Sequence, residues 1–249
     1  MRMRSFGVVA GSVGLAALLT GCGLVGPLEE DTASYDVTDK VTAIQIEADA
    51  GGIEVTESDR QGVHVTEHLS WRKNKPAAGH ETQGDTLVLR FTCPGGSLGG
   101  VSCEVGYQVE IPRGLKVKAV SDSGAVTLRD LSGDVDAASD SGAVTLRDLS
   151  GDVNAASDSG AIDASGLAGK QVVTKTDSGA ITLAFTAQPD KVETSTDSGS
   201  TEVRVPEGPY NIAAKTDSGN KQIDTAHDAS APRSITLSSD SGAIEVHGP

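Results

Sequence analysis

Aromatic side chains are scarce in this sequence: tryptophan, tyrosine and phenylalanine together make up 3 % of its 249 residues. A cleft that binds polysaccharide stacks sugar rings on aromatic faces and places clustered carboxylates beside them. The scarcity of aromatics therefore argues against an enzyme that acts on cell-wall polysaccharide. We keep that function only as an alternative.

Positively charged side chains are also few. The sequence holds 20 lysines and arginines against 35 aspartates and glutamates, which gives a formal net charge of −15. Proteins bind nucleic acids by replacing the counterions of the phosphates with lysine and arginine side chains. We therefore expect no nucleic acid as a partner, and the charge provides no attraction to an anionic lipid surface.

Long apolar segments are limited to the N-terminus. Arg2 and Arg4 precede an apolar run over residues 7–18, which is short for a membrane-spanning helix, and no apolar segment of spanning length follows. The run ends in Leu-Thr-Gly-Cys, which resembles the lipobox of bacterial lipoproteins. The resemblance implies that residues 1–21 are a signal peptide and that Cys22 carries a lipid.

A lipid on Cys22 would anchor the chain to the outer face of the bacterial cytoplasmic membrane. Residues 22–40 contain glycine, proline and acidic residues without hydrophobic periodicity, so we expect a flexible tether there. The membrane is then one partner, reached through the lipid. A protein or glycan of the cell envelope is the other expected partner.

Only three cysteines are present. With Cys22 acylated, Cys93 and Cys103 remain, and they flank a glycine-rich segment in a compartment that is oxidising. A disulfide that closes this segment is the simplest interpretation. No further cysteine and no nearby histidine completes a metal site with this pair.

The tripeptide Asp-Ser-Gly occurs seven times in the second half of the sequence, and consecutive copies are 18 to 23 residues apart. A period of about this length indicates a repeat architecture. Glycine adopts positive φ without steric cost, and aspartate can bond to the backbone two residues on, so the tripeptide predicts a turn. The turns begin at Asp122, Asp140, Asp158, Asp177, Asp197, Asp217 and Asp240.

Apolar and polar residues alternate on both sides of each turn. Around Asp122, for example, Val117 and Ala119 precede the turn and Val126 and Leu128 follow it, with polar residues between most of these positions. Each repeat therefore holds two short strands with one buried face. Stacked repeats of 18–23 residues predict an all-β, solenoid-like fold. A series of antiparallel hairpins is the alternative topology.

The pattern starts before the first Asp-Ser-Gly. A degenerate copy surrounds Asp49, so we expect one β-strand-repeat domain over residues 41–249. Residues 56–116 interrupt the period with alternating runs that predict an inserted antiparallel meander, and residues 117–249 form the coils. The last coil, around Ile244, would expose an open sheet edge to which another chain could pair.

Two further motifs accompany the repeat. Residues 111–117 read Ile-Pro-Arg-Gly-Leu-Lys-Val, and residues 131–135 read Leu-Ser-Gly-Asp-Val. Together with the turns and the cysteine-flanked loop, these motifs make the domain resemble the DUF4097 family of β-strand-repeat proteins, often named putative adhesins. The resemblance implies an all-β domain outside the cytoplasm with no established catalytic activity, and no functional residues to transfer.

Three patterns that could indicate chemistry are better explained otherwise. Asp-Ser-Gly is also the aspartic protease motif, but seven even copies fit a structural repeat. Residues 95–99 match G-x-S-x-G without the strand and helix of a nucleophile elbow. His64 and His68 would lie about 13 Å apart on a strand, too far to share zinc. We therefore predict no catalytic residue, cofactor or metal ligand.

The stacked aspartates are the remaining candidate. Carboxylates about 4.8 Å apart repel one another, and either solvent or Ca²⁺ between the coils could relieve the repulsion. The sequence thus predicts a non-catalytic surface module for binding, adhesion or envelope-stress scaffolding, which uses its flat polar faces. A calcium-stabilised surface module is the alternative.

Overall fold

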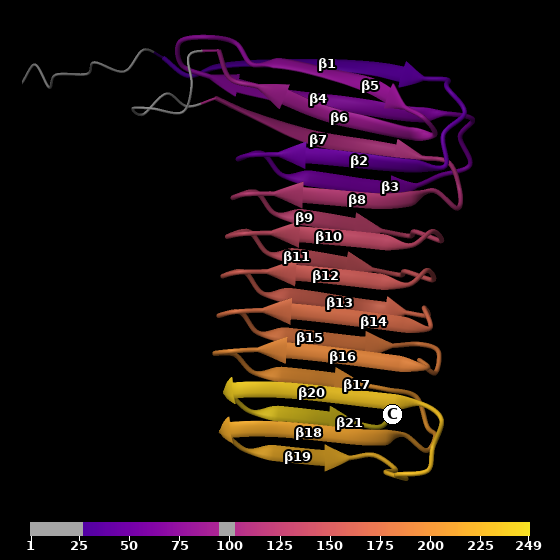
Figure 1. Ribbon diagram of the computed structural model, residues 1–249. Helices are drawn as coiled ribbons and strands as arrows, with labels where there is room; N and C mark the ends of the chain where they lie inside the picture. The colour runs from indigo at the N-terminus through magenta and orange to yellow at the C-terminus, as the bar shows by residue number, and fades with distance from the viewer. Residues whose placement is uncertain (1–26, 95–102) are drawn as a thin grey trace, which may run out of the picture.

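The computed structural model describes residues 27–94 and 103–249 (Figure 1). The predicted signal peptide over residues 1–21, the lipid attachment at Cys22 and the segment 95–99 lie outside these residues. The described residues form 21 strands and no helix. Accordingly, none of the described segments is a helix long and apolar enough to cross a membrane.

The strands form two long sheets, of eleven and ten strands. Sheet A consists, in spatial order, of β1 (Glu29–Val37), β4 (Val63–Trp71), β7 (Cys103–Ile111), β3 (Ile53–Glu57), β9 (Val126–Arg129), β11 (Val144–Arg147), β13 (Ile162–Leu167), β15 (Ile181–Phe185), β17 (Thr201–Arg204), β21 (Ile244–His247) and β19 (Lys221–Asp224). Sheet B consists of β18 (Asn211–Ser218), β20 (Ser234–Ser241), β16 (Lys191–Thr196), β14 (Gln171–Thr176), β12 (Val153–Ser157), β10 (Val135–Ser139), β8 (Lys116–Ser121), β2 (Ala43–Ala48), β6 (Thr86–Thr92) and β5 (Ala77–Gln83).

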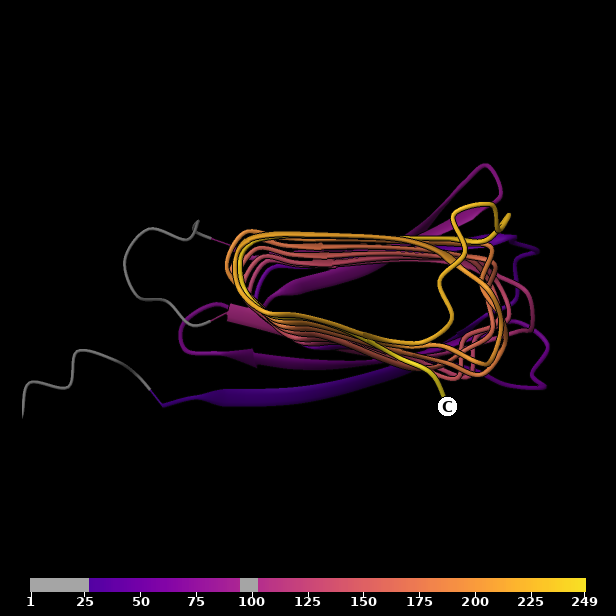
Figure 2. The same ribbon diagram turned by 90° about the horizontal axis from the view of Figure 1, so that it is seen from below.

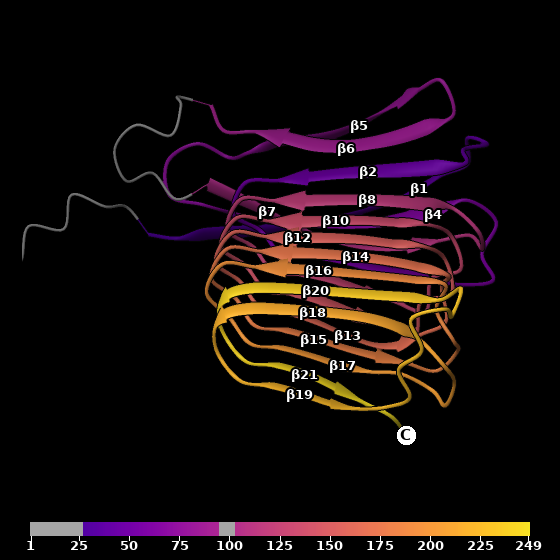
Figure 3. The same ribbon diagram turned by 60° about the horizontal axis from the view of Figure 1, so that its bottom comes forward.

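The chain winds as a flattened coil between the two sheets. Each Asp-Ser-Gly copy joins a strand of sheet B to a strand of sheet A, and after every copy but the one at Asp240 the chain returns to sheet B. Figure 2 looks along the stack, where successive coils superimpose, and Figure 3 shows both sheets obliquely. Neighbouring coils pair in parallel, as β8, β10 and β12 do. This confirms the all-β solenoid and rules out the hairpin alternative.

Equivalent residues of successive repeats stack in columns. Val135 pairs with Val117 on one side and with Val153 on the other, and all three are buried. In sheet A, Val144 lies between Val126 and the next strand in the same way. Because each coil presents the same inward positions, the apolar side chains of all coils join in one core.

The degenerate copy around Asp49 also forms a coil. Its strands β2 and β3 pair in parallel with β8 and β9 of the next coil. It does not end the stack, because β6 and β7 pair in parallel with its other side. β6 and β7 thus form a further coil.

The prediction of one inserted meander over residues 56–116 is wrong in its topology. β4 and β7 pair antiparallel in sheet A, whereas β5 and β6 pair antiparallel in sheet B. A single meander would extend one sheet and leave the inner face of the other uncovered. Dividing the strands between the sheets extends both and buries both inner faces.

The expected tether over residues 22–40 is too long. Residues 29–37 form β1, which pairs with β4 along its whole length. Tyr35 is half-buried and Val37 buried, while the other residues of β1 are exposed. An edge strand with so few buried side chains shows no hydrophobic periodicity, which is why its composition suggested a tether.

The last two coils stack in the reverse of their chain order. β20 and β21 pair with β16 and β17, and β18 and β19 pair with the outer side of β20 and β21. The predicted terminal coil around Ile244 is therefore internal, and residues 211–224 form the terminal coil. Lys221 occupies the inward position that Ile244 fills in its own coil. The reversed order spares the core a buried ammonium group, which is costly.

Candidate functional site

A hydroxyl side chain precedes every Asp-Ser-Gly corner. At the second corner, Oγ of Ser139 accepts a hydrogen bond from the Gly142 N–H at 2.9 Å and donates one to the carbonyl oxygen of Gly124 at 3.1 Å. The hydroxyl thus closes its own corner and joins it to the preceding coil. The equivalent side chains at the other corners are Ser121, Ser157, Thr176, Thr196, Thr216 and Ser239.

The glycine of each corner lies against the backbone of the neighbouring corner. A Cβ on Gly142 would stand 2.1 Å from the carbonyl oxygen of Gly124, and a Cβ on Gly160 would stand 2.0 Å from that of Gly142. Only glycine permits so close an approach. Packing between coils therefore explains both the hydroxyl residue and the glycine of the repeat.

The seven aspartates at the corners are exposed. Their backbones continue the stack: the Ser141 N–H, for instance, donates to the carbonyl oxygen of Asp122 at 3.0 Å. Two of the carboxylates lie near lysines: Asp177 is 3.7 Å from the ammonium group of Lys175, and Asp217 is 3.4 Å from that of Lys215. Because these carboxylates face water, neighbours about 4.8 Å apart repel each other by only about 0.9 kcal/mol.

The aspartate column does not form a metal site by itself. Within residues 27–94 and 103–249, no three histidine, cysteine, aspartate or glutamate side chains are grouped so as to hold a metal ion. Ca²⁺ takes about six to eight oxygen ligands, whereas the column offers one carboxylate per coil. Among the described residues, the corners therefore do not provide the set of oxygen ligands that the calcium-stabilised alternative requires.

The two histidines of β4 do not share a ligand. Nδ1 of His64 lies 2.9 Å from a carboxylate oxygen of Asp36, and Nδ1 of His68 lies 3.4 Å from the hydroxyl of Thr32. Both contacts are with β1, at different points along that strand. The interpretation of these histidines as separate surface groups fits their contacts.

The disulfide joins Cys93 and Cys103, as the sequence led us to expect, with their Cα atoms 6.0 Å apart. It links the end of β6 to the start of β7. A covalent bond therefore joins the two strands of this coil.

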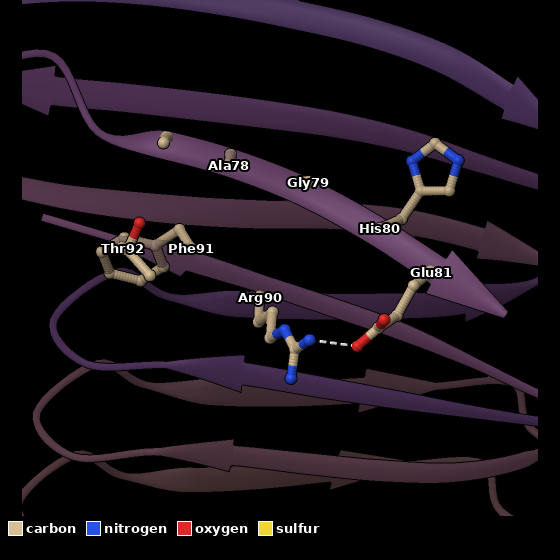
Figure 4. Close-up of a pocket in the computed structure, with 8 residues that line it drawn as sticks. Ala78, Gly79, His80, Glu81, Arg90, Phe91 and Thr92 are labelled. Atoms are coloured by element: carbon tan, nitrogen blue, oxygen red, sulfur yellow. Dashed lines mark hydrogen bonds and ion pairs between the residues drawn. The ribbon is translucent and has the colours of Figure 1, made fainter. Parts of the chain in front are cut away.

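A shallow hollow of about 230 Å³ lies on the β5–β6 hairpin. Figure 4 shows Arg90 and Glu81 reaching toward each other, and the two form an ion pair. His80 points away from that pair and stacks on Tyr35, with ring centroids 4.8 Å apart. The ionisable groups are engaged with their neighbours, so the hollow is a surface groove and not an arrangement of nucleophile and base.

Polar side chains form an unbroken row across the outer face of sheet A, which we call the polar row. One residue from each strand contributes, and neighbours pair in the register of the sheet. Strands lie about 4.8 Å apart, so the row repeats hydrogen-bonding groups at that spacing. Its members are Ser34, Thr66, Gln108, Glu54, Thr127, Thr145, Asp163, Thr182, Glu202, Glu245 and Gln222.

Ion pairs between coils fix parts of the polar row. Both guanidinium nitrogens of Arg147 bond to the carboxylate of Asp163 at 2.9 Å, and Arg129 lies 2.9 Å from Glu54. The hydrogen bonds from Arg147 lower the pKa of Asp163. Bidentate pairs restrain both side chains, so this part of the face is ordered before any partner binds.

The outer face of sheet B carries fewer polar side chains than the outer face of sheet A. Val120, Ala138 and Ala156 occupy successive strands there and are half-buried. Beside them, the side-chain amide of Asn154 donates to the carboxylate of Asp136 at 3.0 Å. This face offers fewer side chains that can hydrogen-bond to a partner, so the polar row of sheet A is the better candidate contact surface.

The sequence patterns did not reveal the role of Glu57. Its carboxylate accepts hydrogen bonds from the Ser132 N–H at 2.9 Å, the Ser132 hydroxyl at 2.6 Å and the Gly114 N–H at 3.1 Å. Burial opposes ionisation, but the bonds to Ser132 and Gly114 outweigh it and hold the pKa of Glu57 below its usual range. Glu57 therefore joins two loops from different coils.

Glu67 was missed as well, although it left a signal in the sequence. It occupies an inward position of β4 among apolar residues and is 5 % exposed. The hydroxyl of Tyr35 donates to its carboxylate at 2.7 Å. Burial, followed by the contact with Glu67, raises the pKa of Tyr35. One acidic residue in an alternating apolar run was the available sign of this buried pair.

Comparison with known proteins identifies the repeat. Residues 113–247 match the family model described as Toastrack DUF4097. No curated protein matches the chain.

Several solved structures are similar. A putative adhesin from Bacteroides fragilis has 15 % sequence identity and a TM-score of 0.53, and the match covers 89 % of this chain and 97 % of that one. A putative cell adhesion protein from Clostridium sporogenes has 13 % identity and a TM-score of 0.43, covering 89 % and 100 %. A putative lipid binding protein from Parabacteroides distasonis has 13 % identity and a TM-score of 0.41, covering 87 % and 96 %. At 15 % identity, the first of these supports the fold alone.

Proposed function

Because the chain belongs to the DUF4097 family, we propose that it is a non-catalytic module that binds a protein or glycan partner at the cell envelope. A lipid on Cys22 would hold it on the outer face of the bacterial cytoplasmic membrane. Adhesion and envelope-stress scaffolding are the roles that such binding would serve.

The polar row is the observation that carries this proposal. A partner that lies along it meets one hydroxyl, amide or carboxylate side chain on each strand. Weak contacts repeated along one molecule add to a high overall affinity, because each later contact forms at high effective concentration. The row therefore suits an extended partner with repeating polar groups, and a scarcity of aromatic platforms does not weaken contacts of this kind.

A triple substitution in the polar row tests the proposal. Thr127→Lys, Thr145→Lys and Thr182→Lys would place three long side chains along the centre of the row. We expect saturable binding of the detergent-solubilised chain to envelope fragments to weaken at least tenfold.

The matched control adds the same three positive charges to the outer face of sheet B through Gln45→Lys, Asn154→Lys and Thr236→Lys. The control should bind envelope fragments as the unmodified chain does, and both variants should melt at similar temperatures. Equal binding by both triple variants would contradict a role for the polar row.

The anchor is tested separately. We expect Cys22→Ser to move the chain from the membrane fraction to the soluble fraction and to abolish incorporation of radiolabelled fatty acid. The substitution Cys22→Ser leaves the polar row unchanged, so its result does not depend on the binding experiment. Unaltered fatty-acid incorporation would show that the lipid is attached elsewhere or that the N-terminus is processed differently.

A further inference from the structure

The terminal coil leaves both sheets open at the same end of the molecule. β18 is the last strand of sheet B and β19 the last strand of sheet A, and their outer edges pair with no other described strand. The start of β18 is covered by the segment that follows β19: the Ile212 N–H donates to Nδ1 of His227 at 3.1 Å, and Tyr210 forms a bridge with His227, so the free part of this edge begins at Ala213. Figures 1 and 3 show these two strands together at the end of the stack. Unpaired N–H and C=O groups along such edges can bond to a further strand.

An apolar side chain of the core is exposed at this end. Ile223 of β19 is 41 % exposed, whereas Val246, its neighbour in the same inward column, is fully buried. All four residues of β19 are exposed. The inner face of the terminal coil is therefore incompletely covered within the described residues, and an additional strand beyond β19 would bury Ile223.

Charge distinguishes this end from the rest of the molecule. Residues 211–224 contain two lysines, Lys215 and Lys221, and two aspartates, Asp217 and Asp224, so the coil is neutral. The whole chain carries a formal charge of −15, and two copies therefore repel each other over most of their surface. The terminal coil is a surface on which two copies can meet without that repulsion.

We propose that two copies of this chain pair end to end through β18 and β19, about a two-fold axis perpendicular to both sheets. Such an axis makes each edge strand antiparallel to its counterpart and lets both sheets continue into the second copy. It brings Ile223 toward its counterpart and buries both. The N-terminal parts of the two copies then lie at opposite ends of the assembly.

Closure by a two-fold axis fits better than head-to-tail stacking. The N-terminal edge strand β1 begins with Glu29, Glu30 and Asp31, and it keeps that acidic edge exposed. Head-to-tail contact would also leave one open end on each assembly and continue into a filament. The proposed contact uses the neutral end alone, so it stops at two copies.

Disulfide trapping tests the contact directly. In the full-length chain, solubilised in detergent and oxidised, Ile223→Cys should yield a covalent dimer on a non-reducing gel. Glu193→Cys, on the outer face of sheet B, is the matched control and should yield none. The native cysteines of the described part are already paired as Cys93–Cys103.

Sedimentation of the same full-length chain gives the second readout. The unmodified chain should sediment as a dimer, and Ile223→Lys should weaken the dimer at least tenfold while leaving the melting temperature of the monomer unchanged. A monomeric unmodified chain, equal trapping of both cysteine variants, or a ladder of species larger than dimers would each overturn the proposal.

Discussion

The corner residues show how single side chains fix the stack. A hydroxyl closes each turn, and a glycine lets the next turn approach, as Ser139 and Gly142 do. The aspartate between them is exposed and bonds to the next coil through its backbone. The aspartate therefore recurs in all seven copies although the packing makes little use of its side chain.

Substitution of a corner glycine should be severely destabilising. A Cβ at Gly142 would meet the carbonyl carbon and oxygen of Gly124 at 2.5 and 2.1 Å, and neither atom can move without shifting a whole coil. We expect Gly142→Ala to lower the free energy of unfolding by about 3 kcal/mol, at the upper end of the range for overpacking. Urea denaturation measures the change.

Gly79→Ala provides the control, because a Cβ there meets nothing within 4 Å. It should leave stability nearly unchanged. A similar small effect for Gly142→Ala would show that the corners do not depend on close backbone approach.

Two buried threonines on β14 should respond in opposite ways to replacement by valine. The Thr174 hydroxyl is buried and has no hydrogen-bond partner among the described residues. The Thr176 hydroxyl accepts from the Gly179 N–H at 3.0 Å and donates to the Gly160 carbonyl at 3.3 Å. An unsatisfied buried hydroxyl costs free energy, and a satisfied one does not.

We therefore expect Thr174→Val to raise the free energy of unfolding by about 1 kcal/mol and Thr176→Val to lower it by about 1–3 kcal/mol. Thermal melting of the two variants side by side gives the sign of each change. Destabilisation of equal size in both variants would mean that the Thr174 hydroxyl is satisfied in solution.

Glu57 predicts a pH dependence of stability. Its pKa is lower in the folded chain than the usual value of about 4.3 for an unfolded glutamate. The stabilisation is therefore complete above the unfolded pKa and is lost as the pH falls through the folded pKa. Glu57→Gln should lower stability at pH 7 by about 1 kcal/mol.

The difference between Glu57→Gln and the unmodified chain should begin to shrink as the pH falls below about 4.3, and it should vanish only below the lowered folded pKa, where Glu57 is also uncharged. Urea titrations at pH 7 and pH 3 measure it, with the exposed Glu207→Gln as a control that changes little at either pH. A difference in the free energy of unfolding that stays constant across this range would show that Glu57 stabilises the fold through contacts that do not depend on its ionisation.

At the scale of the coil, the exact 18-residue period of the first repeats has a direct consequence. Removal of residues 139–156 deletes one coil and brings Ile162 into the register that Val144 occupies beside Val126. Stability in a solenoid is close to a sum over neighbouring repeats. We expect the shortened chain to keep its β-sheet circular dichroism and to melt cooperatively at a lower temperature. Loss of cooperative melting would contradict independent, interchangeable coils.

The sequence was sufficient to predict the coils because each one repeats the same short-range pattern. The inward columns, the corners and the degenerate copy around Asp49 all follow from alternation and spacing, and the Cys93–Cys103 disulfide follows from the expectation of an oxidising compartment. The polar row needed the structure for its order across the sheet, since Glu54 and Thr127 are 73 residues apart yet adjacent in register. The contacts of Glu57 depend on the same long-range stacking.

Two features of the elements could not be predicted from local patterns. β1 has almost no buried side chain, so nothing in its composition separates an edge strand from a tether. In the observed order of the last two coils, Ile244 is buried and Lys221 lies in the terminal coil. The opposite order would bury the ammonium group of Lys221, so predicting the order requires a comparison of the two packings. Lys221 in the inward column was the residue that could have indicated the exchange.

At the scale of the whole molecule, the coils form a long two-sided body with a polar row on one face and a neutral coil at one end. The repeated tripeptide belongs to the architecture, and the proposed contacts lie on surfaces that the repeat displays. The Asp-Ser-Gly corners are therefore structural, and the proposed binding surfaces lie outside them. It also sets the present interpretation apart from a calcium-dependent module, in which the aspartates themselves would bind the ligand.

The most direct test is a thermal melt of the full-length chain in detergent, with millimolar Ca²⁺ and then with a chelator. A ligand at about 100 times its dissociation constant adds about 2.7 kcal/mol per site. If the aspartates only form corners, the two melting curves should coincide. A large upward shift with Ca²⁺ that the chelator reverses would contradict this, and would make the aspartate column a cation site.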